Sequence, residues 1–162
     1  MHFICLTEFN RQKLSQLNKK GREVIDMDNR VGAIGAINGD YYGSRDDGYV
    51  LRNGHLYRDT GSKKREDLVI RSDGSFEIIA EKDTSAADLA AGGAWQIFSF
   101  GPALVRDGEI SVDTDTEVGQ ATYSNPRTAI AVVEPLHYLM VVSDGRTDRS
   151  AGLSLYQLAT IL

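Results

Sequence analysis

Residues 67–81 read DLVIRSDGSFEIIAE, two runs rich in branched apolar residues with an Asp-Gly pair between them. Asp-Gly and Asn-Gly pairs between apolar runs are the strongest short-range signals for a β-hairpin. The stretch therefore predicts two antiparallel strands, residues 67–71 and 75–81, joined by a turn at Asp73-Gly74.

The same pattern extends in both directions along the chain. Three further turns each separate two apolar runs: Asn53-Gly54 between residues 49–52 and 55–58, Asp107-Gly108 between 95–106 and 109–112, and Glu134-Pro135 between 128–133 and 136–143. Residues 31–37 form another apolar run, which also predicts a strand. Residues 139–142 have the composition of a buried strand.

Helices are expected at fewer places. Ser85 with Asp88, and Ser154 with Gln157, have the spacing of a capping box, so each serine is expected to begin a short helix. Residues 10–20 are a weaker helix candidate. The predicted fold class is α+β: a β-rich single domain of mixed sheet, with hairpins and a few packed helices. The second capped helix lacks the usual stop signals before Leu162, so we expect the chain to end within an element.

Composition excludes several classes of protein. The 162 residues suit one domain, and the net charge of −5 argues against binding to nucleic acid. No apolar run approaches the ~18 residues that a membrane span needs. The single cysteine, Cys5, cannot form an intrachain disulfide, and the three histidines are too dispersed to predict a metal site.

Polar residues gather in three loops beside apolar strands, at residues 38–43, 125–128 and 144–150. Loops at strand ends often carry binding and catalytic groups. The candidate site residues are Asn38, Asp40, Arg127, Thr128, Asp144 and Arg146. Each has a simpler alternative: Asp40 as a turn residue, Arg127 as a surface or structural arginine, and Asp144 with Arg146 as a local ion pair. Asp113, Asp115 and Glu117 hint at calcium, but a solvated acidic loop is the preferred interpretation because the EF-hand glycine and final glutamate are missing.

Five motifs in order make the chain resemble a known family. They are AINGDYYG at residues 36–43, FSFGPALV at 98–105, NPRTA at 125–129, VSDGR at 142–146 and SAGLS at 150–154. Together they resemble the phosphodiester glycosidase family, which includes the uncovering enzyme that removes N-acetylglucosamine from phosphomannosyl groups of lysosomal enzymes. The likeness is closer to bacterial, often cell-surface members, sometimes described as exopolysaccharide biosynthesis proteins.

The resemblance implies a domain at residues 31–162, preceded by an incomplete lead-in at residues 1–30. In the family, the last helix is followed by a strand and an Asn-Leu-Asp-Gly-Gly-Gly-Ser/Thr motif, and Leu162 comes before that point. We therefore expect a domain truncated before the Gly-rich motif, with uncovered apolar surface that favours self-association.

The resemblance also implies a reaction: hydrolysis of the bond between a sugar anomeric carbon and a phosphodiester oxygen, of the N-acetylglucosamine-1-phosphodiester type. Arg127, with Arg146 as second choice, would hold the phosphate, and Thr128 would also contact substrate. Asp40 and Asp144 would be the catalytic carboxylates, and Asn38 would contact a sugar hydroxyl or acetamido group.

This interpretation requires no cofactor and no metal. It implies a sugar-phosphate or cell-surface glycan as partner and an extracellular or cell-surface location. Two alternatives remain open: a non-catalytic cell-wall or carbohydrate-binding module, and an inactive fragment of such an enzyme.

Overall fold

The computed structural model of the protein describes residues 37, 39–40, 45–62, 64–99, 101–116, 124–134 and 136–162. The lead-in at residues 1–30, the helix expected at 10–20, nearly all of the strand expected at 31–37, and Asn38 lie outside the described residues.

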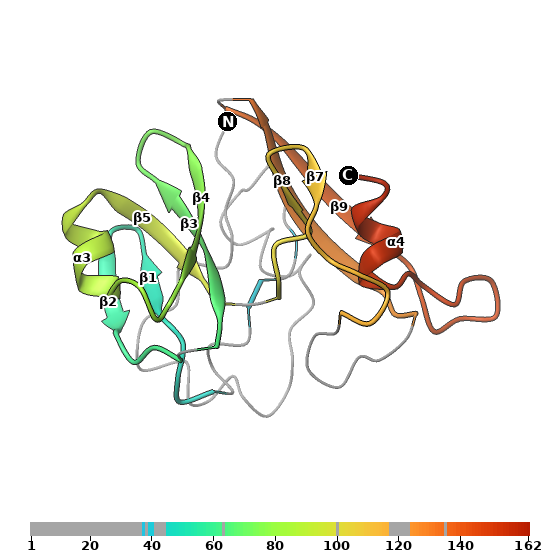
Figure 1. Ribbon diagram of the computed structural model, residues 1–162, viewed down its shortest axis with the longest axis horizontal. Helices are drawn as coiled ribbons and strands as arrows, with labels where there is room; N and C mark the ends of the chain where they lie inside the picture. Colours follow the sequence, from blue (N-terminus) through green and yellow to red (C-terminus); the bar gives the residue numbers. More distant parts are fainter. Residues whose placement is uncertain are drawn as a thin grey trace, which may run out of the picture.

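The described part of the chain is mainly β structure with two short helices (Figure 1). Its elements are β1 (Val50–Arg52), β2 (His55–Arg58), β3 (Glu66–Arg71), β4 (Phe76–Ala80), α3 (Ala86–Ala91), β5 (Ala94–Phe98), β6 (Val105–Arg106), β7 (Glu109–Ile110), β8 (Arg127–Glu134), β9 (His137–Ser143) and α4 (Leu155–Ala159). No described helix is long and apolar enough to cross a bilayer.

All four predicted hairpins form. β1–β2, β3–β4, β6–β7 and β8–β9 are each antiparallel pairs. The run at residues 95–106 divides into β5 and β6, because Gly101 adopts a positive φ of 73° and Pro102 lacks the N–H that a continuous strand needs.

The five-stranded sheet has the order β2-β1-β5-β3-β4. Its pairings, like those of the two hairpin sheets, are all antiparallel, so the expected mixed sheet is not found among the described residues. The α+β label holds only loosely, since the two helices are minor elements.

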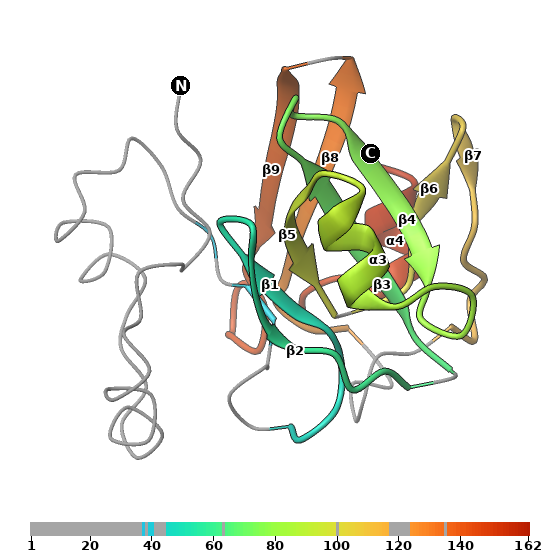
Figure 2. The same ribbon diagram turned by 90° about the vertical axis from the view of Figure 1, so that its left-hand side faces the viewer.

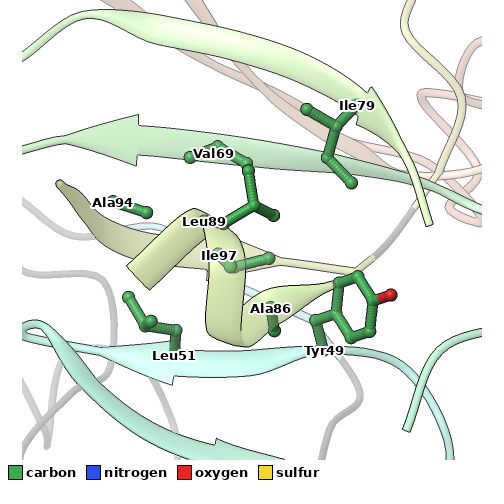
Figure 3. Close-up of a cluster of buried hydrophobic side chains, with 8 residues drawn as sticks. All are labelled: Tyr49, Leu51, Val69, Ile79, Ala86, Leu89, Ala94 and Ile97. Atoms are coloured by element: carbon green, nitrogen blue, oxygen red, sulfur yellow. The ribbon is translucent and has the colours of Figure 1, made fainter. Parts of the chain in front are cut away.

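The sheet lies between two other layers. Helix α3 covers one face, and the β8–β9 hairpin with α4 lies on the opposite side, as Figures 1 and 2 show from two directions. Between α3 and the sheet, eight buried side chains form the core (Figure 3): Tyr49, Leu51, Val69, Ile79, Ala86, Leu89, Ala94 and Ile97. Successive strand residues point to opposite faces, so alternate residues such as Tyr49 and Leu51 meet this core.

Both helices begin at the predicted serine. Ser154 and Gln157 form a complete capping box at α4. At α3, Ser85 accepts from the backbone N–H of Asp88 (3.1 Å), but its hydroxyl also donates to the Asp88 carboxylate (2.6 Å). The aspartate side chain is shorter than the Glu or Gln of a full capping box, and here it binds the serine hydroxyl.

Residues 139–142, which have the composition of a buried strand, are only partly covered in the structure. Leu139, Met140 and Val142 of β9 are all exposed. Among the described residues, β9 pairs with β8 alone, so the hairpin forms a two-stranded sheet that is incompletely covered. Whether this apolar surface leads to self-association stays a prediction.

Replacing Ile97 tests the position of the core. Ile97 is fully buried beneath α3, so Ile97→Ala should lower the free energy of unfolding by about 2–5 kcal/mol. The matched control is Ile161→Ala, at a side chain 63% exposed, which should change it by less than about 0.5 kcal/mol. Urea unfolding of both variants provides the measurement, and equal losses would contradict the packing described above.

Candidate functional site

A groove of about 1930 Å³ lies between the five-stranded sheet and the β8–β9 hairpin. Asp40 lines it together with Arg127, Thr128, Asp144 and Arg146. Five of the six candidate residues from the sequence therefore border one groove, although they come from loops far apart in the chain. What these side chains do there stays a prediction.

Asp40 is held in a buried ion pair with Arg52. Each oxygen of its carboxylate lies 2.9 Å from Nη2 of Arg52, and the two side chains are 2% and 7% exposed. Nη1 of Arg52 donates to the carbonyls of Leu51 (3.0 Å) and Ile97, and its guanidinium lies 4.4 Å from the centre of the Phe98 ring. Asp40 thus makes a long-range structural contact. A simple turn residue, the alternative considered from the sequence, would not make such a contact.

A hydrogen-bond chain extends from Asp40 into the interior. The backbone N–H of Ser99 donates to Asp40 (3.2 Å), and the Ser99 hydroxyl donates to the carboxylate of Glu81 (2.9 Å). The other Glu81 oxygen accepts from the backbone N–H of Ser62. Because Ser99 and Glu81 are both buried, the chain gives each of these carboxylates a donor in place of water.

Asp67 is buried beside this chain without such support. Its side chain is 1% exposed, and neither carboxylate oxygen has a hydrogen-bond partner among the described residues. Burial, followed by the charge of Glu81, raises the pKa of Asp67 to about 8. A carboxyl with this pKa is mainly protonated at pH 7, which removes one negative charge from a crowded acidic interior.

Two arginines sit at the base of the β8–β9 hairpin. Nε of Arg127, at the start of β8, donates to the carbonyl of Leu153 (3.0 Å), and its backbone N–H donates to the Ser143 hydroxyl (3.1 Å). Arg146 donates from Nε (2.9 Å) and Nη2 to the side-chain oxygen of Asn125. Arg146 therefore binds Asn125 rather than Asp144, contrary to the local ion-pair alternative.

Two glycines allow the loop after β9 to lie directly on the backbone that enters β8. A Cβ at Gly145 would fall 2.5 Å from the Pro126 nitrogen, and a Cβ at Gly152 would overlap the backbone of Asn125. Gly152 also has a φ of 95°, and Asn125 and Leu153 exchange two backbone hydrogen bonds of 3.1 and 2.9 Å. This close approach fixes the backbone from which Arg127 and Arg146 project.

The remaining candidates differ in accessibility. Asp144 is exposed, and Thr128 is half-buried opposite Val142 in the β8–β9 pair. The roles of both residues stay predictions.

Several buried polar groups were missed by the sequence reasoning: Arg52, Asp67, Glu81 and Ser99. A signal was available for Asp67, because strand alternation puts it on the same face as the core residue Val69. A carboxylate at an inward position of a predicted strand is unusual. The sequence contains no comparable signal for Arg52, which looks like an ordinary residue before a hairpin turn.

The chain belongs to the phosphodiester glycosidase family, whose model matches residues 31–162. It is also similar to the SPbeta prophage-derived uncharacterized protein YomE of Bacillus subtilis (strain 168), with 27% identity over 143 residues. That match covers 85% of this chain and 22% of YomE, so the chain spans about a fifth of its relative's length.

The protonated state of Asp67 makes stability depend on pH. Its carboxyl has a pKa of about 8 in the folded protein, against 3.8 for an aspartate in water, so the folded state keeps a proton that the unfolded state releases. This bound proton contributes to the free energy of unfolding. The contribution is complete below about pH 4 and is lost as pH rises to about 8, at up to about 1.4 kcal/mol per pH unit. Asp67→Asn should remove this contribution, so the variant should gain stability relative to the wild type from pH 4.5 to pH 8.

Urea unfolding across this pH range provides the measurement. Asp73→Asn is the control, because Asp73 is exposed and its pKa is lowered by hydrogen bonds from Ser75. The stability contributed by the Asp73 carboxylate has the opposite pH dependence: it is lost as pH falls through that lowered pKa. Parallel pH profiles for the wild type and Asp67→Asn would contradict the protonated carboxyl.

Alanine at Gly152 tests the close contact between the two loops. Gly152→Ala should lower the free energy of unfolding by about 1–3 kcal/mol more than Gly93→Ala does, because the new Cβ overlaps the Asn125 backbone. Gly93 is the matched control: its φ is 90°, but a Cβ there meets nothing within 4 Å. Equal free energies of unfolding for the two variants would show that backbone strain alone, without the contact, accounts for the loss.

Proposed function

We propose that this domain hydrolyses sugar 1-phosphodiesters, and specifically N-acetylglucosamine-1-phosphodiesters, to release the sugar and a phosphate monoester. Family membership supports phosphodiester glycosidase activity in general. The observation that carries the proposal is the groove, where Arg127 and Arg146 border the same space as Asp40 and Asp144. This combination supplies cations for a phosphate and one accessible carboxylate, Asp144, for a sugar carbon.

In the proposed mechanism, the arginines act on the leaving group. As the bond to the anomeric carbon breaks, negative charge grows on the departing phosphate, and a guanidinium placed there stabilises it. Arg127 is the first choice, because its contact with the Leu153 carbonyl orients the planar group before substrate binds. Arg146 is the second, since Asn125 engages two of its nitrogens.

The two carboxylates suit different tasks. Asp144 is exposed at the groove and can meet a water molecule or the positive charge that develops on the sugar. Asp40 is engaged by Arg52 and Ser99, which suits a residue that holds the groove wall in place. A phosphate leaving group is already stable as an anion, so protonation by a carboxylic acid matters less than in ordinary glycosidases.

A non-catalytic carbohydrate-binding module is the second candidate. The observation that favours it is the ion pair of Asp40, which leaves Asp144 as the accessible carboxylate of the proposed pair. A binding module would retain the groove and its arginines without turnover. In either case, a cell-surface or extracellular glycan is the proposed partner.

Arg127 provides the test of the proposed reaction. Arg127→Lys keeps the charge but loses the two-point fork, and a charged hydrogen bond of this kind contributes about 1.5–3 kcal/mol. Loss of one or two such bonds should lower kcat/KM by roughly tenfold to several thousandfold, with Arg127→Ala more affected than Arg127→Lys. The assay follows sugar release from a methyl diester of N-acetylglucosamine 1-phosphate.

The assay is run on this chain and on a version extended through the Gly-rich motif that the resemblance predicts. Arg149→Ala is the control, because Arg149 lies on the same loop as Arg146 but does not line the groove. Thermal melts establish that each variant is folded. Full turnover by folded Arg127→Ala would end the phosphate assignment, and binding without turnover in both versions would support the binding module.

A further inference from the structure

A bulge in the middle strand of the five-stranded sheet brings Trp95 to the groove. In the β3–β5 pair, Ile70 is opposite Gln96 and Arg71 is opposite Ala94, which leaves Trp95 as the extra residue. A bulge of this kind redirects a side chain. The indole is 46% exposed and lines the groove together with Asn53 and Gln96.

The indole has a fixed support. A Cβ at Gly54 would fall 3.1 and 3.2 Å from two carbons of the Trp95 ring, so the ring lies directly against the Asn53-Gly54 turn. The backbone N–H of Gly54 donates to the Trp95 carbonyl (2.9 Å). A ring held in this way loses little conformational freedom when a ligand covers it.

Two residues adjacent in sequence to Gly54 and Trp95, Asn53 and Gln96, have side-chain amides that bind each other. The Gln96 amide nitrogen donates to the Asn53 side-chain oxygen (2.8 Å), and the Asn53 backbone N–H donates to the Gln96 oxygen (3.3 Å). An amide pair offers both donors and acceptors, which match the N–H and C=O of an acetamido group. The C–H face of a pyranose ring is apolar and fits against a flat aromatic ring.

Trp95 lies at a distance from Asp40 along the sheet wall of the groove. Ser99, which binds Asp40, is four residues further along the chain, about 13 Å at the rise of an extended strand. The groove of about 1930 Å³ also exceeds the roughly 300–1,000 Å³ of ordinary small-molecule pockets. These dimensions suit a chain of sugars better than a single sugar phosphate.

We propose that Trp95, Asn53 and Gln96 form a second sugar subsite, which binds an N-acetylhexosamine residue of an extended glycan away from the scissile phosphodiester. As a subsite of the substrate groove it rests on the proposed function, and it adds the requirement that the natural substrate is oligomeric. Tyr57 supplies a comparison: it is 47% exposed, as much as Trp95, but does not line the groove.

The single tryptophan of the chain makes the test direct. Chitotriose, a neutral oligomer of N-acetylglucosamine without phosphate, is titrated while intrinsic tryptophan emission is recorded, and calorimetry gives the dissociation constant. Binding should change the emission. Trp95→Ala should weaken binding about three- to tenfold, as expected for loss of one aromatic contact, while Tyr57→Ala binds like the wild type.

Two further measurements separate this subsite from a structural effect and from the reaction itself. Gln96→Ala should weaken chitotriose more than maltotriose, which lacks acetamido groups, whereas a general loss of folding would affect both. Because chitotriose binding needs no turnover, failure to hydrolyse the methyl diester would count against the proposed function and leave the binding result standing. Absence of chitotriose binding, unchanged emission on binding, or equal affinity of Trp95→Ala and wild type would each overturn the subsite.

Discussion

The groove depends on the buried guanidinium of Arg52. This one group contacts the carboxylate of Asp40, the carbonyls of Leu51 and Ile97, and the ring of Phe98. It therefore joins β1, β5 and the Asp40 segment at a single point. Removing one partner of a buried ion pair leaves an uncompensated charge, so Asp40 and Arg52 stabilise the fold only together. An aspartate of the family-like motif at residues 36–43 is in this way fixed to the sheet before any substrate binds.

The same region contains more acid than base. Asp40, Asp67 and Glu81 are buried close enough for the charges of Glu81 and Asp40 to raise the pKa of Asp67, and the three are not neutralised in the same way. Asp40 has Arg52, Glu81 has the N–H of Ser62 and the hydroxyl of Ser99, and Asp67 retains a proton. Ser99 contacts both Asp40 and Glu81, so the wall of the groove and the acidic interior are one hydrogen-bonded unit.

The sequence predicted local structure well and long-range structure poorly. The hairpin turns at Asn53-Gly54 and Asp73-Gly74 follow from residues that tolerate positive φ, a property of the turn itself. The exposure of Val142 and the bulge at Trp95 depend on which strands are neighbours, and no local pattern contains that information. The order of the motifs in the chain identified Asp40, Arg127 and Asp144 as candidate site residues. The partner of Asp40 could not be inferred, because Arg52 belongs to a turn that looks ordinary.

The two walls of the groove differ in how firmly they are held. The sheet wall is supported by the core under α3. The hairpin wall touches that sheet near its tip, where the Tyr138 hydroxyl donates to the Gly74 carbonyl (2.6 Å) and its ring stacks on Phe76 at 5.1 Å. Arg127 and Asp144 lie at the other end of the hairpin, fastened to Leu153 and the loop at Ser150. A phosphate bound by Arg127 would therefore lie at the end opposite this tip contact, where the close approach of Gly152 to the Asn125 backbone and the two Asn125–Leu153 backbone hydrogen bonds hold the hairpin.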